Sequence, residues 1–154
     1  MSSTPKITTF LWFNDNAEEA INHYCAIFKN SKIIQLNRRG DKLFLGVFEL
    51  EGQRFMALNG GPMFKFTEAI SLYVDCETQE EVDSLWDKLI AGGGEASRCG
   101  WLKDRFGLSW QIIPKALGQL MGSPIPAKAQ KVMEAMLKMQ KLDIATLQRA
   151  HDEN

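Results

Sequence analysis

The chain has 154 residues, of which 45% are hydrophobic and 24% charged, and its 18 basic and 19 acidic side chains give a formal net charge of −1. This composition is typical of one globular domain, here residues 1–154, which is large enough to fold without a metal or disulfide staple. The near-neutral charge excludes the basic surface expected of a nucleic-acid-binding or lipid-bound protein. A small molecule is therefore the expected partner, and we expect no nucleic acid.

The three cysteines, Cys25, Cys76 and Cys99, are widely spaced and form no CxxC pair, which predicts neither a disulfide framework nor a zinc ribbon. The first apolar run, Ile7–Phe13, is too short for a signal peptide, and no segment has the roughly 18 apolar residues of a membrane span. We expect a reduced, cytoplasmic protein that does not enter a membrane.

The first part of the chain predicts one strand, one helix and three strands. Ile7–Phe13 is rich in β-branched and aromatic residues, which favours a strand. Asn16 and Glu19 resemble a capping box that opens a helix of about 14 residues. The apolar side chains of this helix recur at helical spacing: Ala17, Ala20, Ile21, Tyr24, Ile27 and Phe28. The three further strands are predicted over Lys32–Arg39, Lys42–Leu50 and Gln53–Asn59.

The same order of elements returns in the second half. A shift of 62 positions places Glu18 and Glu19 on Glu80 and Glu81, and four apolar positions coincide as well, which indicates duplicated modules. The predicted elements are a strand over Ala69–Asp75, a helix opened by the capping box at Thr78–Glu81 and ended by Gly92–Gly94, and strands over Glu95–Cys99, Trp101–Asp104 and Leu108–Ile113. We predict an α+β fold of two βαβββ modules, about 6–61 and 68–114, curving around a cleft, with a helical tail over 115–154.

Alternation along the strands predicts which side chains line the cleft, because neighbours in a strand point to opposite faces. One set is expected to pack beneath the helices: Phe10, Trp12, Ile70, Leu72, Val74, Trp110 and Ile112. The opposite set is expected to face the cleft: Thr9, Leu11, Phe13, Ala69, Ser71, Tyr73, Gln111 and Ile113. This second face is the predicted binding site.

Paired βαβββ modules resemble the vicinal oxygen chelate superfamily, which includes glyoxalase I, extradiol dioxygenases and bleomycin-resistance proteins. Three segments are similar to its PhnB-like branch, whose members are often labelled 3-demethylubiquinone-9 3-methyltransferase: Phe55–Pro62, Cys76–Asp83 and Cys99–Gln111. The resemblance covers Lys6 to Pro114 and extends to Lys141–Ile144. It implies the glyoxalase fold and, because superfamily members commonly dimerise by joining sheets, a homodimer.

The resemblance also implies where a metal would bind, on the first and last strands of each module. Those places fall near Thr9, Ala57, Ala69 and Gln111. Alanine cannot bind a divalent ion, and threonine and glutamine are poor substitutes for imidazole and carboxylate. The two histidines, His23 and His151, lie elsewhere in the sequence. We therefore predict no metal and no other cofactor.

The methyltransferase label has no support in the glycine pattern. A nucleotide-like cofactor on a parallel sheet normally requires a glycine-rich turn between a strand and a helix. Gly60–Gly61 is followed by a further loop, and Gly92–Gly94 ends a helix. We interpret the label as inherited through homology.

Several other residues have both a functional and a structural interpretation. For Cys99, burial is favoured over a nucleophilic role. Lys103 and Asp104 are interpreted as a solvated turn rather than as contacts for an anionic ligand, and Phe106–Gly107 as a turn into the last strand. Arg38 and Arg39 are interpreted as a solvated strand end rather than a carboxylate clamp. Met63 stands where relatives often carry histidine. For Tyr73 and Trp101, packing in the core and stacking on a planar ligand are about equally favoured.

The tail is predicted to be helical around Ala129–Leu137, with Asp143 capping a final helix that contains Ile144, Leu147 and Ala150. Its methionine-rich apolar face could pack on the sheet, join a dimer or cover the cleft.

Two functions follow from these observations. The first is metal-free binding of a small molecule by Thr9, Phe13, Tyr73, Trp101 and Gln111, with no bond broken. The alternative is an enzyme, a glyoxalase-like lyase or isomerase with an unidentified catalytic group, or a methyltransferase as the label claims. The sequence contains no evident pair of base and nucleophile, which favours binding.

Overall fold

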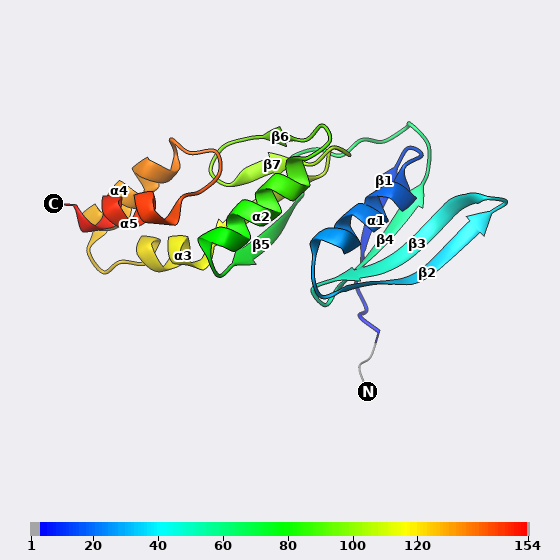
Figure 1. Cartoon of the computed structure of the whole chain (residues 1–154), viewed down its shortest axis with the longest axis horizontal. Helices are drawn as coiled ribbons and strands as arrows, with labels where there is room; N and C mark the ends of the chain where they lie inside the picture. Colours follow the sequence, from blue (N-terminus) through cyan, green and yellow to red (C-terminus); the bar gives the residue numbers. More distant parts are fainter. Residues whose placement is uncertain (1–3, 154) are drawn as a thin grey trace. The chain divides into compact units, whose positions relative to one another are not determined.

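The structure, a computed structural model, describes residues 4–153. The chain divides between Phe66 and Thr67 into two compact units. Each unit contains a four-stranded sheet, with the strand orders β1-β4-β3-β2 and β5-β8-β7-β6 (Figure 1). The neighbours β1 and β4 are parallel, as are β5 and β8, and all other neighbouring strands are antiparallel. The α+β class and the repeated βαβββ order predicted from the sequence are confirmed.

The strands and helix of the first unit lie close to their predicted positions. Its elements are β1 (Thr9–Phe13), α1 (Ala17–Ile27), β2 (Ser31–Arg39), β3 (Lys42–Leu50) and β4 (Gln53–Asn59). The predicted bounds of β3 and β4 are confirmed, whereas β1 begins two residues later than expected.

The capping box predicted at the start of α1 is wrong. The Asn16 side chain makes no capping hydrogen bond. Instead, the Asn59 side chain at the end of β4 accepts a hydrogen bond from the Ala17 amide at 2.8 Å, and its amide nitrogen donates to the Leu43 carbonyl oxygen at 2.9 Å. A cap can come from a residue that is distant in sequence, because any oxygen that reaches the first turn satisfies its free N–H groups.

The core of the first unit lies between α1 and one face of the sheet. Tyr24 of α1 stacks on Phe48 of β3 with ring centroids 6.5 Å apart, and Phe48 stacks on Phe55 of β4 at 5.4 Å. In the register of β1 and β4, Thr9 is paired with Phe55 and Leu11 with Ala57. Paired residues share a face, so Thr9 and Leu11 lie on the helix side of the sheet.

The faces predicted for the first strand are therefore reversed. Leu11 and Phe13, expected in the cleft, are only 4% and 3% exposed, whereas Phe10, expected beneath the helix, is 51% exposed. Phe13 makes an edge-to-face contact with Phe66 at 5.2 Å. Both faces of β1 carry large apolar side chains, so alternation determines the period of the strand but not which face the helix covers.

The second unit repeats the pattern with shorter strands. Its first five elements are β5 (Ser71–Cys76), α2 (Gln79–Ile90), β6 (Glu95–Ala96), β7 (Trp101–Lys103) and β8 (Ser109–Pro114). The capping box of α2 is confirmed, since Thr78 Oγ1 accepts a hydrogen bond from the Glu81 amide at 3.1 Å. Strand β6 is shorter than predicted, because the chain turns at Ser97–Gly100 before β7.

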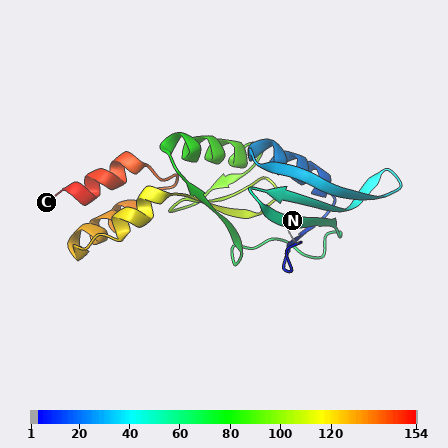
Figure 2. The same ribbon diagram turned by 90° about the horizontal axis from the view of Figure 1, so that it is seen from below.

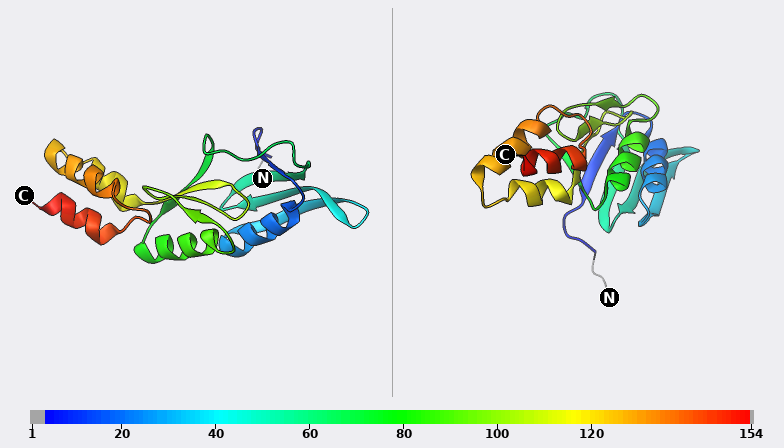
Figure 3. Two further views of the ribbon diagram at one scale, coloured as in Figure 1. Left: turned by 90° about the horizontal axis from the view of Figure 1, so that it is seen from above. Right: turned by 60° about the vertical axis from the view of Figure 1, so that its left-hand side comes forward.

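Helix α2 covers one face of the β5–β8 sheet, as Figures 2 and 3 show. It contacts β5, β7 and β8, and it buries Val82, Leu85, Trp86 and Leu89. On β8, Trp110 and Ile112 are buried at 2% and 0% exposure. Gln111 and Ile113 alternate with them and thus point to the opposite face.

The tail forms three helices, α3 (Lys115–Met121), α4 (Pro126–Met136) and α5 (Ile144–Asp152), which contact one another (Figure 3). Helix α3 lies within the helical tail predicted over 115–154, but its own bounds were not predicted. The tail core consists of Ile113, Leu120, Val132, Leu142 and Leu147. Because Ile113 belongs to β8, the tail packs against its own unit. Backbone bonds from the Cys99 amide to the Met139 oxygen, at 2.9 Å, and from the Gly100 amide to the Gln140 oxygen, at 2.8 Å, strengthen this attachment.

None of the helices within residues 4–153 has the length and hydrophobicity that a membrane span requires.

Candidate functional site

Three of the predicted binding residues form one row across the second sheet. Gln111 of β8 is paired with Tyr73 of β5 on one side and with Trp101 of β7 on the other. Residues paired in this way share a face, and this face is opposite α2. Adjacent strands are about 4.8 Å apart, so the two aromatic residues lie about 10 Å apart with the amide between them. Tyr73 is 60% exposed, while Trp101 and Gln111 are half-buried.

Two serines lie beside this row. Gln111 Nε2 donates a hydrogen bond to Ser71 Oγ at 2.9 Å, which fixes the orientation of the amide. Ser109 is paired with Ser71 and is only 1% exposed, and its hydroxyl has no hydrogen-bond partner among the described residues. Gln111 Oε1 and the Ser71 hydroxyl are the uncharged polar groups beside the row that this face offers to a ligand, whereas the Ser109 hydroxyl is buried.

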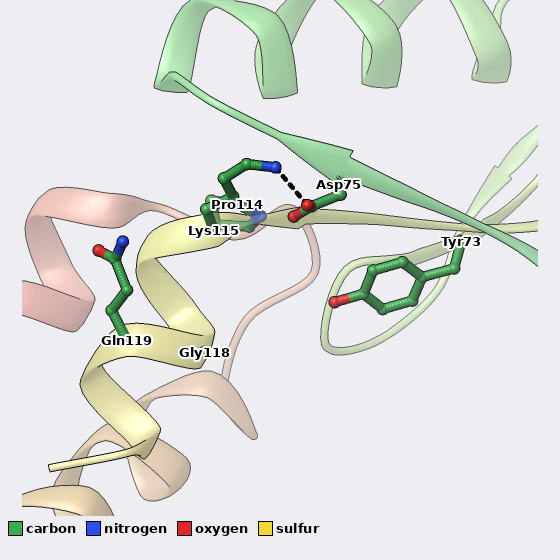
Figure 4. Close-up of a pocket in the computed structure, with 6 residues that line it drawn as sticks. All are labelled: Tyr73, Asp75, Pro114, Lys115, Gly118 and Gln119. Carbon is green, nitrogen blue, oxygen red and sulfur yellow. Dashed lines mark hydrogen bonds and ion pairs between the residues drawn. The ribbon is translucent and has the colours of Figure 1, made fainter. Parts of the chain in front are cut away.

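A hollow of about 420 Å³ adjoins the row where β5 and β8 end and α3 begins. Its lining combines strand and tail residues: Tyr73, Asp75, Pro114, Lys115, Gly118 and Gln119. In Figure 4 the Tyr73 ring extends from β5 across the hollow, and its hydroxyl points toward α3 near Gly118. The volume lies within the range of about 300–1,000 Å³ that is typical of ligand pockets.

The charged side chains beside this face are paired with one another. Lys115 contacts Asp75 and also Glu77, whose Oε1 is 3.2 Å from Lys115 Nζ, and the hydrogen bonds from these carboxylates raise the pKa of Lys115. Lys103 contacts Glu68, whose hydrogen bond raises the pKa of Lys103. Both lysines are therefore protonated at neutral pH and already have anionic partners.

The Tyr73 phenol is a proton donor at neutral pH. Partial burial, followed by the negative charge of Asp75, raises its pKa above the usual value of 10.0. Within residues 4–153, the hydroxyl makes no hydrogen bond. The site thus combines an exposed aromatic ring with an available O–H group.

The two remaining predicted residues are in the first unit. Thr9 is half-buried on the α1 side of β1, and Phe13 is buried on the same side. Their position corrects the expectation that they line the face opposite the helix. A role for either residue in ligand binding stays a prediction.

The positions that the resemblance implies for a metal do not provide a suitable donor set. Ala57 is fully buried, Ala69 precedes β5, and the Gln111 amide is bonded to Ser71. A shift by one residue on the first sheet gives Phe10 and Met56, which bind no divalent ion. Within the described residues, no three His, Cys, Asp or Glu side chains are grouped to hold a metal.

Other candidate residues have structural roles. Asp104 is 3% exposed and accepts hydrogen bonds from the amides of Phe106 and Leu108 and from the Trp110 ring N–H, which confirms a turn but one that is buried rather than solvated. Arg38 binds Glu18 with its two terminal nitrogens.

Two more candidates lie in irregular segments. Cys99 is half-buried, with a positive φ of 58°, in the turn before β7. Met63 is 77% exposed in the loop after β4.

Comparison with known proteins identifies the family. The model of the family described as 3-demethylubiquinone-9 3-methyltransferase matches residues 5–113. The solved structure of a PhnB protein from Bacillus cereus is 37% identical, with a TM-score of 0.67, over 71% of this chain and 99% of that chain. The chain belongs to this family. The PhnB-like branch predicted from the sequence is thus confirmed, and with it the vicinal oxygen chelate superfamily.

Two more distant solved structures support the fold alone. Protein PA1353 from Pseudomonas aeruginosa is 19% identical, with a TM-score of 0.61, over 72% of this chain and 98% of that chain. The fosfomycin resistance protein FosX from Listeria monocytogenes, in complex with Mn(II) and sulfate, is 16% identical, with a TM-score of 0.51, over 71% of this chain and 88% of that chain. Comparison with curated proteins gives no match.

Sequence reasoning missed the part of the site that the tail contributes. Lys115, Gly118 and Gln119 belong to α3, which lies beyond the segment that the family model matches. Gly118 interrupts the helical pattern of this short helix, which conceals it in the sequence. Ser109 could have been found, because it alternates in phase with Gln111 along β8.

Proposed function

We propose that this PhnB-like protein binds a small planar molecule on the β5–β8 sheet, without a metal and without breaking a bond in the ligand. The observation that carries the proposal is the row Tyr73–Gln111–Trp101, in which an amide lies between two aromatic side chains. Aromatic surface supplies affinity through stacking, while a few fixed polar groups select orientation.

The side chains near the row favour binding over catalysis. Of the two histidines, His23 is on α1 and His151 is on α5, where it contacts Asp152. Burial is the main cause that raises the pKa of Cys76 to about 12, so this thiol is not an activated nucleophile. The carboxylate of Asp75 is engaged by Lys115.

The methyltransferase description of the family does not extend to an identifiable cofactor site in this chain. Gly60 and Gly61 follow β4, and Gly61 is tied to β1 by the ring N–H of Trp12 at 2.9 Å. Gly92–Gly94 follows α2. Neither segment joins a strand to the start of a helix, which is where glycine-rich turns bind nucleotide-like cofactors.

A ligand screen on the purified full chain tests this proposal. A compound that binds the folded protein raises its stability by about 2.7 kcal/mol at a concentration 100 times its Kd, which thermal shift detects. For a positive compound, Q111A and W101A should each weaken binding about tenfold, as measured by calorimetry. Q148A, on the exposed face of α5, is the matched control and should bind normally.

Two results would contradict the proposal. The first is a ligand whose affinity is unchanged in both Q111A and W101A. The second is chemical conversion of the bound compound, followed by mass spectrometry, which would establish the enzymatic alternative.

The proposal includes a homodimer in the cytoplasm. The three cysteines are unpaired, which fits a reducing compartment. Apolar side chains that a dimer partner would cover are exposed on and beside α4, with exposed fractions of 50% for Ile125, 38% for Met133 and 57% for Leu137. Light scattering coupled to gel filtration tests the oligomeric state, and fractionation of the source cells tests the location.

A further inference from the structure

The second unit has a hollow beside α3 that the side chains of the described residues leave open. It lies between the Tyr73 ring and the tail helix, and its charged lining residues, Asp75 and Lys115, are paired with each other. Three observations concern what this hollow holds: the glycine in its wall, the exposed ring, and the balance of charge.

Gly118 keeps the hollow open at the expense of helix stability. Among residues 4–153, a side-chain Cβ at this position would meet no atom outside the backbone of its own helix within 4 Å, so packing of these residues does not require glycine here. Its φ is also not in the left-handed region, so the backbone does not require glycine either. Glycine within a helix costs about 1 kcal/mol relative to alanine. An unneeded glycine that faces a hollow is consistent with clearance for another molecule.

Tyr73 supplies the opposite wall with a ring that is 60% exposed. Its hydroxyl points toward α3 near Gly118 (Figure 4) and makes no hydrogen bond within residues 4–153. The aromatic ring of a ligand would stack on the face of Tyr73, and an acceptor substituent that reaches past the edge of the Tyr73 ring would accept a hydrogen bond from the hydroxyl.

The charged side chains at the hollow are already paired with one another, which disfavours an ionic ligand. Lys115 already contacts Asp75 and Glu77, and Lys103, on the same face, contacts Glu68. An anionic ligand would meet Asp75 when it approached Lys115, and a cationic ligand would meet Lys115 when it approached Asp75. Neither sign finds an unpaired counter-ion in the hollow.

We propose that the hollow bounded by Tyr73 and Gly118 binds an uncharged aromatic or heteroaromatic ring that carries a hydrogen-bond acceptor. The inference rests on the proposed binding function and extends it to a subsite that the tail builds. The ligand ring stacks on Tyr73, its acceptor accepts a hydrogen bond from the phenol hydroxyl, and Gly118 provides the clearance. Gln119 lies at the rim as a further polar group.

Three small probes of one shape test the charge selection: benzamide, benzoate and benzylamine. Each is titrated into the isotopically labelled full chain at pH 7 and constant ionic strength, and the backbone amide shifts of Tyr73 and Gly118 are followed by NMR. We expect benzamide to bind about fivefold or more tightly than either ion, which corresponds to roughly 1 kcal/mol. Equal or tighter binding of an ion would overturn the inference.

Substitutions at Gly118 test the position. G118L fills the hollow and should weaken benzamide binding about tenfold or more, while A127L adds the same side chain to the exposed surface of α4 and should have no effect. G118A should raise the melting temperature, because alanine favours the helix, and still weaken binding. A gain in stability with a loss of affinity separates a ligand contact from a structural role.

The outcomes distinguish this inference from the broader proposal. If benzamide binding survives G118L but is lost in Q111A and W101A, the hollow is not the subsite and the row remains the site. If benzamide binding is unaffected by G118L, Q111A and W101A alike, both proposals are wrong.

Discussion

Asp104 is expected to be the polar side chain on which the second unit depends most. Its Oδ1 accepts hydrogen bonds from the Phe106 and Leu108 amides at 2.9 and 3.0 Å, and its Oδ2 accepts one from the Trp110 ring N–H at 2.9 Å. These bonds hold the turn between β7 and β8. They also orient Trp110, which is 2% exposed in the core beneath α2.

The substitution D104A removes all three acceptors and leaves buried donors without partners. A hydrogen bond to a charged group contributes about 1.5–3 kcal/mol, and the three share one carboxylate, so we expect a total loss of about 3–5 kcal/mol. D104N keeps one oxygen acceptor but faces Trp110 with an N–H donor. It should lose about 1–3 kcal/mol, and it provides a measurable variant if D104A does not fold.

Urea unfolding followed by tryptophan fluorescence measures these differences, since three of the four tryptophans, Trp86, Trp101 and Trp110, lie in the second unit. D87A, on the exposed side of α2, is the matched control and should stay within about 0.5 kcal/mol of the parent chain. A change of less than about 1 kcal/mol in D104A would refute the role assigned to this carboxylate.

Three further predictions concern the backbone, the tail and a buried thiol. G100A should destabilise the protein by about 1–2 kcal/mol more than G107A in urea unfolding. Both glycines have a positive φ, but only a Cβ at Gly100 would lie 3.0 Å from the Ile112 carbonyl oxygen and 2.7 Å from the end of the Ile113 side chain, and equal losses would contradict the clash. The hydrogen bond from Lys141 lowers the pKa of Asp83 below its usual 3.8 and raises that of Lys141 above 10.5. Tail attachment is thus fully supported between these values, and is weakened as pH falls through the folded pKa of Asp83 or rises through that of Lys141. Hydrogen exchange of the tail amides should be slowest between these two pKa values and become faster outside them, and D83N should abolish the increase at acid pH. An increase at acid pH that persists in D83N would contradict the role of the Asp83–Lys141 pair. Cys76, whose pKa is raised to about 12, should resist iodoacetamide at pH 8 in the folded protein and react in urea, and mass spectrometry showing equal modification in both states would disprove its burial.

The repetition of local patterns was sufficient to predict the order of the strands and helices in both units. Two segments 62 residues apart share the same order of strand and helix patterns, which implies two βαβββ modules. The bounds of β3 and β4 follow from the turn residues between the strands. Helix capping by Thr78 and by Asp143 was also predicted from the sequence, because each capping hydrogen bond joins residues three positions apart. Interactions of this range are encoded in a short window of sequence.

Interactions between distant segments decided the rest. The helix-facing side of β1 depends on where α1 packs, and the start of α1 is capped by Asn59, 43 positions after the expected Asn16. The row of Tyr73, Gln111 and Trp101 exists because of strand register, which alternation alone does not supply. The hollow at Gly118 requires α3 to return beside β5. The residue types are a property of the sequence, but their proximity is a property of the packed chain, since side-chain contacts across strands and helices join positions that no local period relates.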